Sequence, residues 1–350
     1  MGNANNKTDT HGIDFVLPWV DGSDKEWMAL KRRYENPDDS VISSDKDVFS
    51  DWRYRDYGLL RYWFRAVERF APWVNRVFFV TCGQKPDWLD ESNPKLRLVN
   101  HKDYIPADYL PTFQSNTIEL NLYRIADLSE QFVLFNDDTF LLRPVEPEFF
   151  FKKGLPVIPC DLGVPHELGY NNISRVEINN SGVLKLSLDV EHLIRKNIRK
   201  YVNLHELGIK RAAKNFLSFA INRVVIFNSF GHMPQNHLKS TFSEIWRVKP
   251  QVMDTTSRSR FRGDDNVNQW LACAWNMVSG RFYPANEKRR GVFYYVNADN
   301  LNQICDTIRR QASPQICLSD KDSSNKMEQF FHKVAEEFDK LLPDKSSFEK

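Results

Sequence analysis

The stretch QFVLFNDDTFLL, residues 131–142, decides the fold that we expect for this chain. Its first half is a short apolar run, which is typical of a strand buried on both faces of a parallel sheet. Two adjacent carboxylates, Asp137 and Asp138, follow it directly. Since two like charges repel each other, the pair either ends the strand in an ordinary Asx turn or holds a cation. On this stretch alone both interpretations stay open.

Strands and helices alternate upstream of this stretch. Apolar runs and helical spacing predict strands at 13–20, 76–82, 96–100 and 131–136, and helices at 55–70 and 116–128. In the second helix, Asn116 and Glu119 have the spacing of a capping box, with Asn116 as N-cap. The alternation predicts an α/β fold in which a mostly parallel, Rossmann-like sheet is flanked by helices.

The pattern changes after about residue 150. Residues 156–183 are rich in turn formers and predict irregular structure or a β-hairpin, whereas 184–222 predict basic helices. Further helices are expected at 266–280, closed by Gly280 as a C-cap, and at 326–342, stopped by Pro343. The chain then divides into a disordered tail (1–12), an α/β part (13–155), an inserted hairpin and helical subdomain (156–230), and a remainder (231–350).

Composition excludes several classes of protein. The net charge of +2 over 350 residues argues against a dedicated nucleic-acid binder. The five cysteines form no CxxC pair, so neither a zinc site nor a disulfide framework is indicated, and a reducing compartment is expected. The N-terminus lacks the apolar core of a signal peptide, and no apolar run reaches the roughly 18 residues of a membrane span. We expect a soluble protein that at most lies against a membrane.

Three polar clusters follow predicted strands, where ligands of open α/β sheets bind. They are DGSD (21–24), TCGQ (81–84) and NDD (136–138). Convergence of Asp21 with Asp137 and Asp138 favours the cation, because Mg²⁺ uses carboxylates together with substrate phosphates. In SRSRFRGDD, 257–265, arginines precede a predicted helix start, so Arg262 is a candidate anion contact, and Asp264 or Asp265 either caps the helix or joins a metal site. His101 and His232 lie in polar, turn-like contexts, where a histidine is more often a surface residue than a catalyst.

At these residues the chain resembles the Stealth family, the hexose-1-phosphate transferases of bacterial capsule synthesis, to which the animal GlcNAc-1-phosphotransferase is related. Four ordered blocks carry the resemblance, and the last is the weakest: IDFVLPWVDGSDKEW (13–27), the region from RYRDYG to NDDTFL (53–141), GHMPQ with SRFRGDDNVNQWLA (231–272), and PQICLSD with SSFEK (314–350). The chain departs from many relatives at Leu59, Cys82 and Tyr123, where Glu, Asn and His are frequent. These departures put the donor or acceptor preference in doubt.

The resemblance implies transfer of a sugar 1-phosphate from a nucleotide diphosphosugar, with a UDP-hexose or UDP-N-acetylhexosamine expected, to a saccharide hydroxyl, releasing a nucleoside monophosphate. The resemblance implies that Asp138 and Asp137 bind Mg²⁺ or Mn²⁺, that Arg262 binds phosphate and that His232 is the general base. It implies that Asp21, Gly22 and Glu119 position the donor. Further substrate contacts are implied at Arg124, Asn136, His101 and Asp265. A site role for Glu119 competes with its capping role.

Two other functions stay open: a metal-dependent glycosyltransferase that moves only the sugar, and a non-catalytic carbohydrate-binding protein. The expected partners are the donor and a growing polysaccharide, without nucleic acid, in the cytoplasm. Basic helices at 194–214 either contact anionic lipid, acidic polymer or capsule assembly machinery at the inner face of the plasma membrane, or form a solvated face.

Overall fold

The computed structural model describes residues 12–35, 48–163, 172–222, 226–227, 231–320 and 326–350. The predicted tail, 1–12, lies almost entirely outside these residues. The strands are β1 Asp14–Pro18, β2 Val77–Thr81, β3 Leu96–Asn100, β4 Gln131–Leu134, β5 Thr139–Leu141, β6 Phe151–Lys152, β7 Leu155–Pro159, β8 Leu162–Gly163, β9 Ile226–Phe227, β10 Gln235–Leu238, β11 Tyr283–Ala285, β12 Val292–Tyr295 and β13 Gln315–Ser319. The α-helices are α1 Lys25–Tyr34, α2 Leu60–Phe70, α3 His101–Tyr104, α4 Ser115–Asn121, α5 Asn172–Lys185, α6 Val190–Lys196, α7 Ile198–Tyr201, α8 Leu204–Leu207, α9 Ile209–Asn222, α10 Lys239–Val248, α11 Pro250–Arg258, α12 Trp270–Val278, α13 Leu301–Arg309 and α14 Lys326–Leu341.

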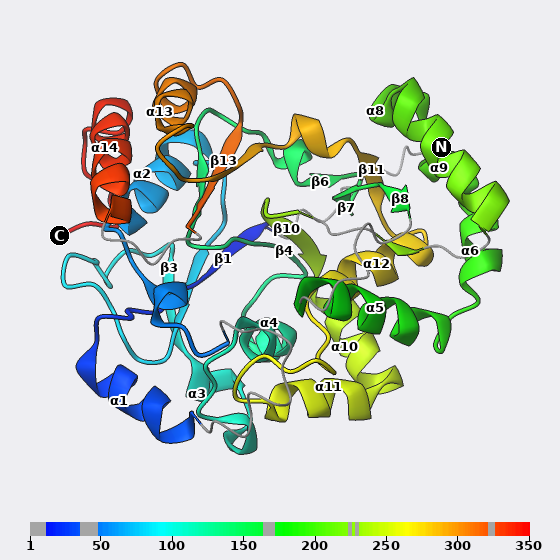
Figure 1. Ribbon diagram of the computed structural model, residues 1–350, viewed down its shortest axis with the longest axis horizontal. Coiled ribbons are helices and arrows are strands. Elements are labelled where there is room, and N and C mark those ends of the chain that lie inside the picture. Colours follow the sequence, from blue (N-terminus) through cyan, green and yellow to red (C-terminus); the bar gives the residue numbers. More distant parts are fainter. Residues whose placement is uncertain (1–11, 36–47, 164–171, 223–225, 228–230, 321–325) are drawn as a thin grey trace, which may run out of the picture.

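A five-stranded sheet of order β10-β4-β1-β2-β3 forms the centre of the molecule (Figure 1). β1 runs parallel to β2 and β4, β2 runs parallel to β3, and only the edge strand β10 is antiparallel. All four strands predicted in the N-terminal half are therefore confirmed. The sheet places the ends of β1, β2 and β4 at one edge, as the strand-end argument requires.

Helices cover both faces of the sheet, and successive side chains of each strand point to opposite faces. Phe15 and Leu17 of β1 enter a core built with α2, α13 and α14, whereas Val16 enters a second core built with α10 and α12. Phe15, Val16 and Leu17 are each fully buried. The near-continuous apolar runs in the sequence follow from this double covering, and the α/β fold class is confirmed.

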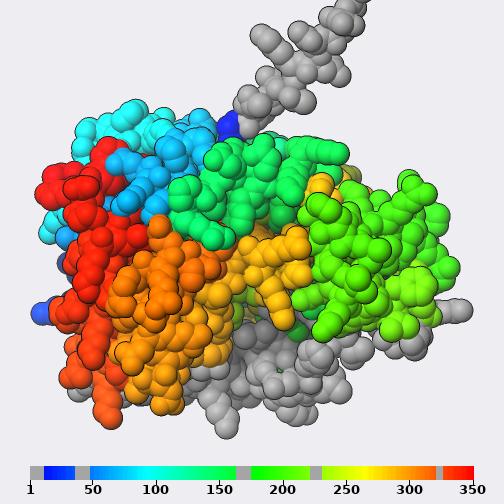
Figure 2. Space-filling view, turned by 90° about the horizontal axis from the view of Figure 1, so that it is seen from above, coloured from blue at the N-terminus to red at the C-terminus, as the bar shows by residue number. Residues whose placement is uncertain are grey.

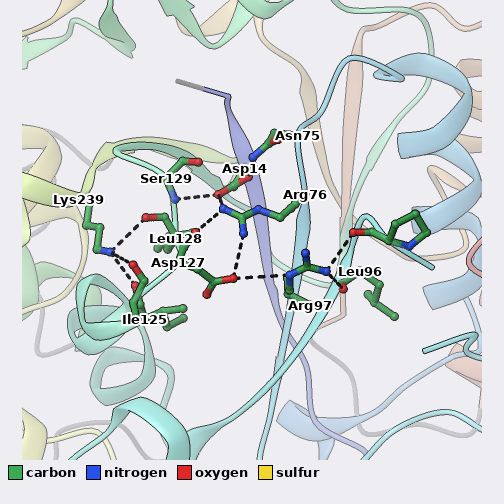
Figure 3. A network of polar contacts seen from close by, with 12 residues as sticks. Asp14, Asn75, Arg76, Leu96, Arg97, Ile125, Asp127, Leu128, Ser129 and Lys239 are labelled. Carbon is green, nitrogen blue, oxygen red and sulfur yellow. Dashed lines mark hydrogen bonds and ion pairs between the residues drawn. The ribbon is translucent and has the colours of Figure 1, made fainter. Parts of the chain in front are cut away.

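The opposite edge of the sheet, where β1 begins, is held by a polar network (Figure 3). The buried carboxylate of Asp14 accepts hydrogen bonds from the side chain of Asn75 and from the backbone of Ser129, both at 2.8 Å. Arg76 lies 3.7 Å from Asp14 and pairs with Asp127 at 2.9 Å. Since these groups satisfy one another, the contacts at this edge of the sheet are structural.

The middle of the chain contradicts part of the sequence prediction. Residues 156–183 were expected to be irregular or a hairpin; β6 and β7 do form an antiparallel pair, but 172–185 form the helix α5. The basic helices expected at 184–222 are confirmed as α6 to α9. The helix expected at 266–280 spans only α12, and Gly280 follows it with a φ of +72°, a conformation that favours glycine.

The C-terminal residues return to the central layer. Glu349 pairs with the buried Arg65 of α2 through two hydrogen bonds of 2.8 Å, and Asp90 donates its backbone N–H to the carbonyl of Phe348. The five cysteines are free thiols. In the described part of the chain, no helix is long and apolar enough to cross a membrane.

Candidate active site

The turn after β1 and the turn after β2 are joined by hydrogen bonds. The backbone N–H of Asp21 donates to Oε1 of Gln84 at 2.9 Å, and Nε2 of Gln84 donates to the carbonyl of Asp21 at 3.0 Å. The Asp21 carboxylate accepts from the backbone and the hydroxyl of Ser23, at 2.8 and 2.6 Å. Gly22 donates its N–H to the carbonyl of Tyr54 at 3.0 Å, and a Cβ at this glycine would lie 2.2 Å from that oxygen. Only glycine therefore fits at position 22.

Asp137 and Asp138 follow β4 at the same edge of the sheet. Desolvation by the surrounding protein, together with repulsion from Asp138 and Asp56, raises the pKa of Asp137 to about 7. Asp137 is nevertheless exposed to solvent, so ions from solution can reach it. Burial raises the pKa of Asp138 as well, while hydrogen bonds from Cys317 and Thr139 lower it by a smaller amount. Asn136 is exposed and accepts the backbone N–H of Thr139 at 3.2 Å, so a turn is present beside the crowded carboxylates.

Two further carboxylates, Asp56 and Asp320, join this group, and sequence analysis assigned them no role. Both repel the charge on Asp137, and burial raises the pKa of each. The hydroxyl of Tyr57 donates a hydrogen bond to Asp320. Asp320 directly follows β13, a strand that was not predicted; the rule that selected Asp138 would have found it had this strand been recognised.

His232 lies beside Asp138. Its charge lowers the pKa of that carboxyl, and its backbone carbonyl lies 3.4 Å from the hydroxyl of Thr139. The imidazole stacks on Phe293 of β12 with a centroid distance of 4.0 Å and an interplanar angle of 13°, and the edge of Tyr295 lies nearby. These rings fix the plane of the histidine side chain next to the carboxylates.

Arg262 and Glu119 form a second group of charged residues. Tyr54 connects this group to the turn after β1. Glu119 is buried in α4; burial raises its pKa, while the charge of Arg262 lowers it. Arg262 lies within 3.5 Å of the hydroxyl of Ser115, and its charge also lowers the pKa of Tyr54, which burial raises to about 12. The predicted capping box is wrong: α4 begins at Ser115 with Gln114 before it, so Asn116 lies inside the helix and Glu119 is turned toward Arg262.

The loop that carries Arg262 is tied to α5 and to the loop before α4. Phe261 stacks on Phe113 at 5.2 Å and 19°, and Arg175 of α5 lies 3.4 Å from Asp264. Asp265 is exposed and accepts a hydrogen bond from Asn266 at 3.0 Å. Neither aspartate caps a helix, because α12 begins only at Trp270.

Two predicted substrate contacts lie apart from these groups. The guanidinium of Arg124 lies over the rings of Tyr123 and Trp246, at 4.9 and 4.7 Å, on the side of α10. His101 begins α3 after β3; burial lowers its pKa to about 4, so its ring is neutral at pH 7. Its Nε2 is buried and has no hydrogen-bond partner among the described residues.

The carboxylates supply the hard oxygen ligands that Mg²⁺ and Mn²⁺ prefer, so their chemistry fits such a cation. Within the described ranges, no group of three or more His, Cys, Asp or Glu side chains is close enough to hold a metal ion by itself. A cation here would therefore need oxygen atoms from substrate or water, as Mg²⁺ sites commonly do.

Comparisons with known proteins find relatives over nearly the whole chain. Models of Stealth conserved region 1 and conserved region 2 match residues 11–36 and 53–157. The capsular polysaccharide phosphotransferase WcwK of Streptococcus pneumoniae is 37% identical over 97% of this chain and 99% of its own length. The receptor polysaccharide phosphotransferase WefC of Streptococcus gordonii is 38% identical over 96% and 98%, and the exopolysaccharide phosphotransferase cps2G of Lactiplantibacillus plantarum is 33% identical over 97% and 96%.

The α/β fold, the strand-end carboxylates and these relatives define an enzyme of the phosphotransferase class. More particularly, the chain belongs to the Stealth family.

Proposed function

We propose that the protein transfers a sugar 1-phosphate from a nucleotide diphosphosugar to a saccharide hydroxyl during capsular or exopolysaccharide synthesis. The observation that carries this proposal is the grouping of Asp137, Asp138, Asp56 and Asp320 at the strand ends, linked through Gly22 and Tyr54 to Arg262. Crowded carboxylates suit a cation, and an arginine suits phosphate oxygens. Together these residues match a diphosphate that carries a bound metal ion.

Asp138 and Asp137 would hold Mg²⁺ or Mn²⁺. The bound cation would neutralise charge on the donor diphosphate as the transferred phosphorus is attacked. The pKa of Asp137 supports this assignment: desolvation, followed by repulsion from Asp138 and Asp56, raises it to about 7, and a bound cation would offset both. Arg262 would pair with phosphate oxygens while Glu119 and Ser115 hold its side chain, and Asp21 with Gly22 would position the donor.

His232 is our assignment for the general base. It would take the proton of the acceptor hydroxyl while the acceptor oxygen bonds to the sugar-bearing phosphorus and the bond to the nucleotide phosphate breaks. The products are a phosphodiester and a nucleoside monophosphate. The cytoplasm, where nucleotide sugars are made, is the compartment that suits this donor.

Product analysis tests the reaction. The enzyme is incubated with Mg²⁺, a saccharide acceptor and a panel of nucleotide sugars, and the released nucleotide is separated by chromatography. The proposal expects nucleoside monophosphate in equal amount to new phosphodiester, detected by ³¹P NMR. Release of nucleoside diphosphate would instead identify a glycosyltransferase, and saccharide binding without turnover would identify a binding protein.

A further inference from the structure

The helix α9 turns its polar side chains toward the protein. Asn215 is fully buried, accepts the backbone N–H of Leu162 at 2.9 Å and donates to the carbonyl of Tyr201 at 2.9 Å. Arg211 and Lys214 pair with Asp161, the latter at 2.7 Å. Because these contacts anchor one side of α9 on the segment around β8, the opposite side faces outward.

The outward side of α9 is apolar. Ile209, Ala213, Phe216, Leu217 and Ala220 are all exposed, at positions i, i+4, i+7, i+8 and i+11. The three large side chains are 76%, 54% and 53% exposed, in the order Ile209, Phe216, Leu217. A helix face that stays in water usually carries polar residues, so this apolar face favours a partner for α9. We call these five residues the α9 stripe.

Cationic side chains border the α9 stripe. Residues 189–222 hold seven Lys or Arg against three Asp or Glu, and two of the seven, Arg211 and Lys214, pair with Asp161 on the other side of α9. Lys210 is exposed beside the stripe, and Arg195 lies 5.5 Å from the ring of Phe219, one turn from Phe216. Figure 2 shows this region as a green lobe at one end of the molecule. Exposed apolar side chains bordered by Lys and Arg are typical of a helix that lies in a lipid interface.

We propose that the α9 stripe docks on an anionic lipid bilayer, with Phe216 and Leu217 entering the headgroup boundary and Lys210 contacting lipid phosphates. A second copy of the chain fits less well, because a two-fold interface would press the same cationic surface against itself. An acidic polymer explains the charge but leaves the apolar side chains in water. The proposal does not depend on which group the enzyme transfers.

Vesicle sedimentation tests the proposal with the full chain. Wild type should bind vesicles of phosphatidylcholine with about 30% phosphatidylglycerol more tightly than vesicles of phosphatidylcholine alone. The double variant Phe216→Ser/Leu217→Ser should lose about tenfold or more of this affinity. Lys210→Glu should weaken it less and reduce its salt dependence. Leu186→Ser is the matched control, because Leu186 is 80% exposed and lies outside the α9 stripe, in the turn after α5.

Circular dichroism and thermal unfolding should show that the double variant keeps its fold, and its turnover of a soluble acceptor should stay unchanged. Equal binding of wild type and double variant, or equal losses in the double variant and Leu186→Ser, would overturn the proposal. So would a wild-type dimer that ignores vesicles and becomes a monomer in the double variant, a result that identifies a second copy as the occupant.

Discussion

The side-chain amide of Asn179 in α5 donates a hydrogen bond of 2.8 Å to the backbone carbonyl of Asp264, two residues after Arg262. The same amide donates to the carbonyl of Asn266 at 2.9 Å. One side chain of α5 therefore holds both sides of the turn that follows Arg262, the arginine to which we assign phosphate binding.

Asn179→Ala should loosen this turn and raise KM for the nucleotide sugar about tenfold, with a smaller change in kcat, because two carbonyls lose their donor. Steady-state kinetics over a range of donor concentrations measures both constants. Asn203→Ala is the control, since Asn203 caps α8. An unchanged KM in Asn179→Ala would show that the turn holds Arg262 without this contact.

His232→Ala should lower kcat by about 10² to 10⁴, the usual contribution of a general base. Thermal unfolding should change little, because His232 is only half-buried. His205→Ala is the matched control, since the side chain of His205 is 90% exposed. Near-normal turnover of His232→Ala would remove this residue from the mechanism.

The raised pKa of Asp137 predicts a link between pH, stability and Mg²⁺. Its folded-state pKa of about 7 lies above the ordinary 3.8, so its contribution to stability is fully present below pH 3.8 and is lost as the pH rises through 7. Without Mg²⁺, Asp137→Asn should therefore melt a few degrees above wild type at pH 8, and this difference should shrink steadily as the pH is lowered toward 4.

Mg²⁺ should raise the melting temperature of wild type at pH 8 and raise that of Asp137→Asn much less, as differential scanning fluorimetry would show. Glu336→Gln should behave as wild type, because the side chain of Glu336 is 56% exposed on α14 and has no proposed role in the site. Equal Mg²⁺ effects in wild type and Asp137→Asn would argue against Asp137 as a ligand.

The Arg65–Glu349 pair should contribute strongly to stability. The side chains are 8% and 2% exposed, so Glu349→Ala leaves a buried guanidinium without its carboxylate and should cost about 3–5 kcal/mol of unfolding free energy. Glu91→Ala breaks the exposed pair with Lys85 and should cost less than about 1 kcal/mol. Urea denaturation compares the two, and similar losses would contradict the burial argument.

The central sheet could be predicted because its strands are apolar on both faces and end in polar turns, signals that lie within a few residues of each other. The helix α5 could not be predicted, because NNISRVEINNSG has the composition of a loop. Tertiary contacts stabilise the helix: Val176, Val183 and Leu184 are buried, and Asn180 donates to Asn268 at 2.9 Å.

Candidate site residues could be predicted at the ends of strands that are recognisable in the sequence. A residue that follows an unrecognised strand was missed. Asp21, Asp137 and Asp138 follow near-continuous apolar runs, whereas Asp320 follows QICLS, which has a polar residue at each end and pairs with the three-residue strand β5. Glu119 had the spacing of a capping residue as well as a site role implied by the resemblance, and the charge of Arg262, more than a hundred residues away, favours the site role.

The return of Glu349 to Arg65 sets an order on folding during synthesis. These partners are 284 positions apart, so α2 and the sheet face beneath it emerge from the ribosome long before α14 and the last residues that complete their core. Until then, that apolar face lacks its cover. A chain stalled before α14 therefore exposes an apolar surface that is prone to aggregation.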